Sequence, residues 1–174
     1  HGQFTMSGGT ITNAVGGKAT GRTGDGGDGI YCGDTLTIEG GEIKQATGGK
    51  ATGESGTGGS GIRSKIVKIL GGLITKAKGG EATGEDSDGG AGIASSGTVS
   101  ISDGKIEQAA GGRATGEDGT GGHGIHSNGT LTIRGGEIQQ TAGGDATGKG
   151  GSGIRSGGSV KIWGGTITKA TGGS

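Results

Sequence analysis

Proline is absent from this sequence and aromatic side chains are scarce, and the two absences exclude several familiar classes of protein. Aromatic residues make up 2% of the 174 residues and hydrophobic residues 25%, too few for an ordinary globular core. Collagen requires abundant proline and glycine at every third position throughout, so it is also excluded. The single cysteine, Cys32, cannot form a disulfide within the chain.

Neither sign of charge predominates, and no long apolar run is present. Sixteen basic and sixteen acidic residues are interspersed, so the formal net charge is zero. Proteins that bind nucleic acid or anionic membranes usually carry a basic patch, and none is visible in the sequence. No stretch of about 18 apolar residues exists, so we expect no nucleic-acid partner and no insertion into a membrane.

Glycine is the residue that the chain has in excess, 52 of 174, and it recurs within a tandem repeat. The stretch from Gly29 to Ser60 is one complete copy, and copies aligned on their Gly-Ile pairs follow at steps of 32, 31, 32 and 29 residues. A fixed period of this size indicates stacked units, each completed by its neighbours. We therefore expect one domain, residues 1–174, of six coils: 1–28, 29–60, 61–91, 92–123, 124–152 and 153–174.

Each unit contains three short apolar segments bordered by glycine, in the second copy Gly29–Cys32, Thr35–Ile38 and Glu42–Ala46. Their alternation and β-branched residues are typical of short strands with one buried face, and the frequent glycines disfavour helix. The predicted fold is all-β: a parallel β-solenoid with three strands per coil, turned at glycine corners. Equivalent residues of successive coils should then stack about 4.8 Å apart. The expected apolar columns are Ile30, Ile62, Ile93, Ile125, Ile154; Leu36, Val67, Val99, Leu131, Val160; Ile38, Ile69, Ile101, Ile133, Ile162; and Ile11, Ile43, Ile74, Ile106, Ile138, Ile167.

The remainder of each unit, GGKATGESGTGGS in the second copy, carries glycine at every third position, as at Gly53, Gly56 and Gly59. Polyproline II has three residues per turn, so this spacing lines one edge with glycine, where another backbone can approach closely. We expect extended, polyproline-II-like segments layered on one another or on the solenoid wall. The alternative is a mobile glycine loop. Alanines that would anchor the layered segments are Ala19, Ala51, Ala82, Ala114 and Ala146.

The strand motifs GDGIYCGDTLTIEGGEI and GHGIHSNGTLTIRGGEI resemble the repeats of a bacterial right-handed parallel β-helix family described as carbohydrate-binding. They are also similar to Gly-rich repeats in surface proteins of Gram-positive bacteria. The resemblance covers the strand part of all six units but not the segment that contains Ala-Thr-Gly. It implies a right-handed β-helix, an extracellular or cell-surface location and Ca²⁺-assisted binding of polysaccharide. It transfers no site, because the family's acidic ligand positions are not recognisable at matching places.

Carboxylates are the first candidates for a metal site. Glu54, Glu85 and Glu117 occupy one column and are flanked by Asp86 and Asp118. Like charges stacked in adjacent coils repel one another. Either these side chains point apart into water, or a hard cation such as Ca²⁺ lies among their oxygens.

Other titratable residues do not form a recognisable catalytic or metal-binding constellation. His123 and His126 are three residues apart but belong to different columns, and a zinc site needs three or four ligands. Asp28 weakly resembles a calcium-binding repeat motif, but its column continues through Ser60 and Ala91, which do not suit calcium. No Ser/His/Asp set or carboxylate pair recurs, so we predict that the protein is not an enzyme.

A candidate sugar-binding surface combines threonines with one tryptophan. Trp163 belongs to a column that should face outward, and an exposed indole is either a platform for a sugar or a contact for another subunit. Ice binding is a minor alternative, because it would need a regular threonine grid and Lys68 and Lys161 interrupt this one. The threonines on the outward face of the predicted strands are Thr35, Thr37, Thr130 and Thr132.

The two ends of the repeat array lack the polar or helical cap that a monomeric solenoid normally carries. Phe4 and Met6 enter the core columns in the first unit, and Ile162 and Ile167 end them in the last, near Trp163. We predict an extracellular structural or adhesive protein that associates end to end with copies of itself into filaments, or that belongs to a longer surface stalk. The competing explanation is a fragment whose caps lie outside this sequence.

Overall fold

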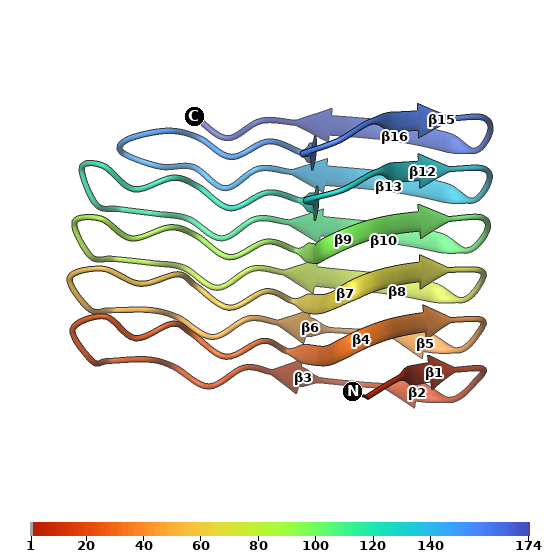
Figure 1. Cartoon of the computed structure of the whole chain (residues 1–174), viewed down its shortest axis with the longest axis horizontal. Coiled ribbons are helices and arrows are strands. Elements are labelled where there is room, and N and C mark those ends of the chain that lie inside the picture. The colour runs from red at the N-terminus through yellow and green to blue at the C-terminus, as the bar shows by residue number, and fades with distance from the viewer. Residues whose placement is uncertain (1) are drawn as a thin grey trace.

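Alternating aliphatic and polar residues build two parallel β-sheets that share one core along the whole stack (Figure 1). The computed structural model describes residues 2–174, which form strands and turns but no helix. Strands of successive coils pair in parallel, so the chain is a parallel β-solenoid of about five turns. The six predicted units amount to about five turns because the units 1–28 and 153–174 are each incomplete.

Each sheet collects one side of every coil. The first sheet contains β1 (Phe4–Met6), β4 (Ile30–Ile38), β7 (Ile62–Ile69), β9 (Ile93–Ile101), β11 (Ile125–Ser127), β12 (Leu131–Ile133), β14 (Ile154–Ser156) and β15 (Val160–Ile162). The second contains β2 (Thr10–Ile11), β3 (Ala14–Val15), β5 (Glu42–Ile43), β6 (Ala46–Thr47), β8 (Leu73–Lys78), β10 (Lys105–Ala110), β13 (Glu137–Ala142) and β16 (Thr166–Thr171). Figure 1 shows these strands in one half of the molecule and the Gly-rich segments in the other.

The coil has two walls where the sequence predicted three strands, because the first two predicted strands lie in the same sheet. In the second coil they form the single strand β4, with an irregular register between Cys32 and Thr35. In later coils the same irregularity separates β11 from β12 and β14 from β15. The sharp turn into the second sheet is made by a glycine such as Gly41, whose φ of 81° is a conformation that side chains disfavour.

All four predicted apolar columns are confirmed by the strand register. Ile30 pairs with Ile62, Leu36 with Val67 and so on through the stack. In the second sheet the isoleucine column continues without interruption from Ile11 to Ile167. Side chains in the inner coils are fully buried, and each contributes roughly 1.5 to 3 kcal/mol of stabilisation.

A column of small polar residues bridges the irregular register of the first sheet. The hydroxyl of Ser95 donates to the carbonyl of Lys65 in the preceding coil, at 2.7 Å, and accepts from the amide of Gly97. The equivalent serines make the same bond to the preceding coil, and the thiol of Cys32 donates to the carbonyl of Thr35. Backbone groups that the strand break leaves unpaired are thereby satisfied. The column comprises Cys32, Ser64, Ser95, Ser127 and Ser156.

The Gly-rich half of each coil consists of an outgoing arm and a returning arm, each containing a pair of glycines. The amide of Gly27 donates to the carbonyl of Gly17 across the two arms, and the amide of Gly49 donates to Gly27 of the coil before. This pattern continues as an unbroken ladder, in which every amide donates to the carbonyl of the preceding member. In order, its members are Gly17, Gly27, Gly49, Gly59, Gly80, Gly90, Gly112, Gly122, Gly144, Gly151 and Gly173.

The Gly-rich segments are layered on one another, as the glycine spacing predicted, and do not form a loose loop. Their closest contacts involve the adjacent glycine pairs as well as the glycines at every third position. A Cβ added to Gly48 would lie 1.8 Å from the carbonyl oxygen of Gly59 in the facing arm. One added to Gly80 would lie 1.9 Å from the oxygen of Gly49 in the coil before. Neither glycine has a positive φ, so space alone requires glycine there. Of the predicted anchoring alanines, three are fully buried: Ala51, Ala82 and Ala114.

Replacing a ladder glycine of an inner coil should therefore be costly even though its backbone conformation suits alanine. We expect Gly80→Ala to lower the free energy of unfolding by about 3 kcal/mol or more, because overpacking against rigid backbone cannot relax. Gly33→Ala is the matched control, since its added Cβ would meet nothing closer than the Tyr31 hydroxyl at 3.9 Å. Urea denaturation followed by circular dichroism measures both. Equal stability of the two variants would show that the close glycine packing is not required.

Loss of one bridging serine should also destabilise the stack. Ser95→Ala removes the donor to Lys65 and the acceptor for Gly97, and an unsatisfied buried group costs about 1–3 kcal/mol. Ser95→Cys, which copies Cys32 of the second coil, should lose less. Thermal denaturation of the two variants checks the order, and an unchanged melting temperature for Ser95→Ala would contradict it.

Candidate functional site

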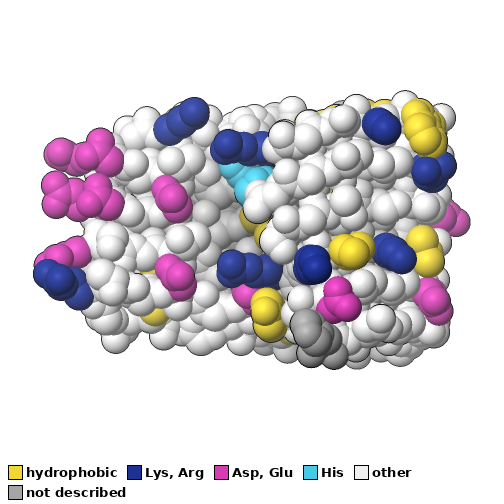
Figure 2. Space-filling view, in the orientation of Figure 1, with side chains coloured by type: hydrophobic (Ala, Val, Ile, Leu, Met, Phe, Trp, Pro, Cys, Tyr) yellow, Lys and Arg dark blue, Asp and Glu magenta, His cyan; other side chains and the backbone are white. Residues whose placement is uncertain are grey.

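A groove lies on the lateral surface at the junction between the Gly-rich arms and the first sheet (Figure 2). Its volume is about 380 Å³. Returning arms form one side, with Gly89 and Gly90 among the lining residues, and outward side chains of the first sheet form the other. The small residues Ala91 and Ala94 lie in the middle of its length, so the groove is hollowed between bulkier groups. Those groups are Arg63, His123, His126, Asn128 and Arg155.

Asp28, in the column before the Gly-Ile pair, satisfies both donors that face it at this junction. Its Oδ1 accepts from the backbone amide of Ser60 in the next coil, at 2.7 Å. Its Oδ2 lies 3.5 Å from the guanidinium of Arg63. One carboxylate therefore accepts from a backbone donor and also pairs with an arginine.

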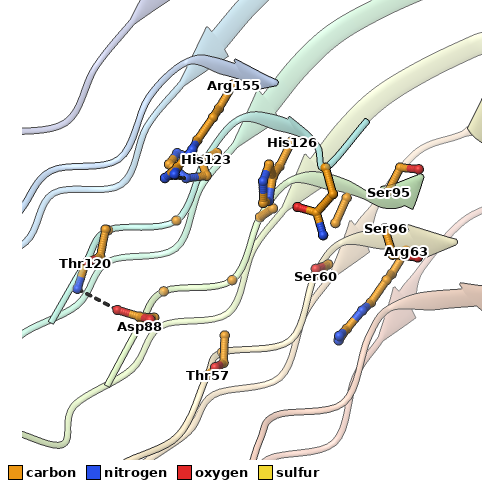
Figure 3. A pocket seen from close by; sticks show the side chains of 18 residues that line it. Thr57, Ser60, Arg63, Asp88, Ser95, Ser96, Thr120, His123, His126 and Arg155 are labelled. Carbon is orange, nitrogen blue, oxygen red and sulfur yellow. Dashed lines mark hydrogen bonds between the residues drawn. The ribbon is translucent and has the colours of Figure 1, made fainter. Parts of the chain in front are cut away.

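His123 occupies the same column three coils later. Like Asp28, it faces a backbone amide of the next coil and an arginine. Its Nδ1 accepts from the backbone amide of Ser152 at 2.9 Å, and its Nε2 lies 3.1 Å from the NH1 nitrogen of Arg155. The ring also contacts His126 edge to face, with 5.0 Å between ring centroids. Figure 3 shows Arg155, His123 and His126 close together at one end of the groove, with Arg63 near the other.

Both imidazoles resist protonation in this position. Burial is the main cause that lowers the pKa of His123 to about 4, and the neighbouring His126, Arg155 and Lys149 add to it while Asp88 opposes it. Burial and Arg155 also lower the pKa of His126. At neutral pH both rings are uncharged, and the arginines supply the positive charge of the groove.

Asp88 also lines the groove, where it caps a backbone amide. Its Oδ1 accepts from the amide of Thr120 at 2.8 Å (Figure 3). Asp25, two coils earlier in the stack, accepts from the amide of Thr57 in the same way. The carboxylate of Asp88 is thus fixed on the arm side of the groove. No ion pair joins it to Arg155 within the part of the chain that is described.

The contact between His123 and His126 was not predicted from the sequence. Their columns are different, as predicted, but the rings are in contact because the two columns flank the bend from arm to strand. The signal available in the sequence was the spacing that Asp28 shares with His123: each precedes a Gly-Ile pair, and an arginine follows the next such pair. Through residues 2–174 no three His, Cys, Asp or Glu side chains gather as a group that could hold a metal ion.

The five carboxylates predicted as a calcium site lie at the tips of the Gly-rich loops, where Figure 2 shows acidic side chains along one edge. Glu54 is highly exposed and lies 3.7 Å from the guanidinium of Arg22. The described acidic residues do not converge as a group of three or more, so the arrangement lends no support to a cation there. The five residues are Glu54, Glu85, Glu117, Asp86 and Asp118.

Trp163 is exposed, as predicted, but one face of its indole is occupied. The guanidinium carbon of Arg134, from the coil before, lies 4.2 Å from the ring centroid. The predicted threonines are half-buried on the outer side of the first sheet, where their columns include Lys68 and Ile66 in the third coil. A lysine and an isoleucine therefore interrupt the threonine columns one coil after Thr35 and Thr37. These threonines are Thr35, Thr37, Thr130 and Thr132.

The residues predicted for an end-to-end interface lie at the two opposite ends of the stack. Phe4 and Met6 belong to the columns of Leu36 and Ile38. At the other end, Ile162 is 55% exposed and Trp163 63% exposed, and Ile167 is partly buried. Figure 1 places the N-terminal and C-terminal coils at opposite ends of the molecule.

Within residues 2–174 no helix is long and apolar enough to cross a membrane. Comparison with protein-family models, with curated proteins and with solved structures found no match.

The lowered pKa of His123 makes stability depend on pH. In the unfolded chain a histidine titrates near 6.5, so protons bind the unfolded state more readily and stability falls as pH drops from about 6.5 toward 4. His123→Asn keeps an acceptor for Ser152 but does not titrate, so this variant should lose less stability across that window. Melting temperatures measured from pH 7 to pH 4 test the difference. Parallel curves for the two proteins would contradict it.

Proposed function

We propose that this protein is a non-enzymatic structural protein whose solenoid continues from one copy to the next by end-to-end stacking, forming a filament. The observation that carries the proposal is the likeness between the two end faces of the stack and every internal boundary between coils. Each internal boundary joins the same apolar columns and the same glycine ladder. At the end faces the same apolar columns and outgoing glycine arms reach the surface of the stack.

The apolar columns support this proposal through their change in exposure. Leu131 and Ile133 are 0% and 1% exposed beneath the last coil, whereas Val160 and Ile162, which follow them in the same columns, are 51% and 55% exposed. An exposed apolar row with a defined register favours a partner of matching spacing. Another coil of the same repeat has that spacing.

The strand register also predicts which residues of two stacked copies would be in contact. Phe4 belongs to the column that ends in Val160, and Met6 to the column that ends in Ile162. Ile11 starts the column that ends in Ile167. A copy stacked on the last coil would therefore continue three apolar columns at once. The contact is head to tail, which yields an open filament and not a closed ring or dimer.

The close approach of the outgoing glycine arms supports the same arrangement. Gly49, Gly80, Gly112 and Gly144 each approach the coil before so closely that a Cβ would lie 1.9 Å from a carbonyl oxygen. Gly17 occupies the equivalent position of the first coil, and a Cβ there would meet nothing within 4 Å. A stacked copy would bring the carbonyl of its Gly173 into that space, as the carbonyl of Gly17 approaches Gly49 at the first internal boundary.

An extracellular location and an adhesive role belong to the same proposal. They are supported by the resemblance of the strand motifs to repeats of bacterial surface proteins, and by Gly-rich arms that meet backbone to backbone. A protein of this kind needs no catalytic constellation, because extension and stiffness are its contribution.

Gly17→Ala offers a test that separates assembly from folding. The substituted side chain has open space and an allowed φ within one molecule, so the melting temperature should stay within about 1 °C, while it would clash with a stacked copy. We expect wild-type protein to form rods of increasing length with concentration in electron micrographs, and Gly17→Ala to remain in short particles.

Two controls accompany this experiment. Gly33→Ala adds the same methyl group to the side of the stack and should leave rod length unchanged, whereas Ile162→Lys should shorten the rods from the opposite end. Sedimentation velocity gives the same comparison in solution. A wild type that stays monomeric up to millimolar concentration, or rods of Gly17→Ala as long as those of wild type, would refute the proposal.

A further inference from the structure

We propose that the lateral groove binds an oxyanion, which accepts hydrogen bonds from the guanidinium of Arg155 and from the Nε2–H of His123. This site is independent of the end faces and would be present in a single molecule as well as in a filament. Two observations support it: both ring nitrogens of His123 face hydrogen-bond donors, and the equivalent residue Asp28 pairs with an arginine where His123 cannot.

The conflict lies on the ring of His123. A neutral imidazole has one N–H donor and one acceptor nitrogen, whereas an arginine and a backbone amide can only donate. Nδ1 faces the amide of Ser152 at 2.9 Å and Nε2 faces Arg155 at 3.1 Å, so both nitrogens face donors. Accepting from the backbone amide places the proton on Nε2, where it points toward the Arg155 donor.

Equivalent residues near the other end of the groove show which group is missing. There, Asp28 accepts from the amide of Ser60 and also pairs with Arg63. With His123 in the place of Asp28, the backbone amide still has its acceptor, but the arginine has lost the carboxylate. Arg155 has no ion pair within 4 Å among residues 2–174, whereas Arg63 has one. An external oxyanion would take the place of the carboxylate and accept from both donors.

The surroundings suit an anion of modest size that enters from solvent. His126 contacts His123 and contributes no charge at neutral pH, because burial and Arg155 lower its pKa. Lys149 adds positive charge near His123, and Asp88, the nearby negative group, is bonded to the amide of Thr120. Ser60, Ser96, Thr120 and Asn128 supply further polar groups along the groove, which is large enough for more than a single inorganic ion.

We call the groove end at His123 and Arg155 the upper site, and the end at Asp28 and Arg63 the lower site. His123→Asp is the most direct test, because it places in the upper site a carboxylate like that of Asp28. The new carboxylate should accept from Ser152 and pair with Arg155, so the variant should be at least as stable as wild type and yet bind the anion at least tenfold more weakly. Arg155→Gln should weaken binding by a similar factor. Asp28→Asn, at the lower site, is the control and should leave binding at the upper site unchanged.

Binding is measured by calorimetry and by the imidazole signals of His123 in NMR spectra, with sodium sulfate replacing sodium chloride at constant ionic strength. Saturable binding that perturbs the His123 signals, and that both upper-site variants lose, would support the proposal. Absence of saturation by wild type, or wild-type affinity in a folded His123→Asp variant, would overturn it.

The source of the oxyanion is resolved by two further probes in the same experiment. Acetate presents one free carboxylate, and polygalacturonate presents carboxylates on a chain that could follow the groove. Tighter binding of the polymer per carboxylate would assign the site to an acidic polymer, and equal binding would assign it to a small free anion. Both results require the loss of binding in Arg155→Gln, and polymer binding that survives this substitution would overturn the proposal.

Discussion

The close approach of glycine backbones is the constraint on which the rest of this structure depends. At the paired glycines of each arm, no side chain separates the outgoing arm from the returning arm or one coil from the next. Each amide in the glycine ladder donates to a carbonyl that an added Cβ would obstruct, as at Gly80 and Gly90. Glycine loses more backbone entropy on folding than other residues, so the arms are stable only because their hydrogen bonds and contacts repeat in every coil.

The other half of the coil has the opposite chemistry, and the two halves stabilise one another. Between the sheets, columns of isoleucine, leucine and valine provide the hydrophobic burial that the arms lack. Both halves share the same register because one chain passes through them in every turn. A change of one residue in coil length is absorbed locally, as at the irregular register near Ser64, where a column of hydroxyl groups satisfies the exposed carbonyls.

The groove is a consequence of joining these two halves. Sheets that enclose side chains stand about 10 Å apart, whereas glycine layers approach more closely, so the surface steps inward at the junction. Side chains at that step are the places where coils can differ without disturbing the stack. Asp28 and His123 illustrate this freedom, since both accept from a backbone amide but only the carboxylate also neutralises an arginine.

The sequence by itself determined the solenoid, its columns and the layering of the glycine arms. A repeat with fixed period forces equivalent residues into register, so the apolar positions of one copy, such as Ile43, predict the whole column from Ile11 to Ile167. The merging of two predicted strands into β4 was not visible, because Gly33 between them is typical of a corner, and pairing with β7 shows that the sheet continues. The contact between His123 and His126 was also decided by tertiary structure. Residues in different columns meet only where the chain bends from arm to strand, and the path of that bend depends on how closely the arms pack, which spacing alone does not specify.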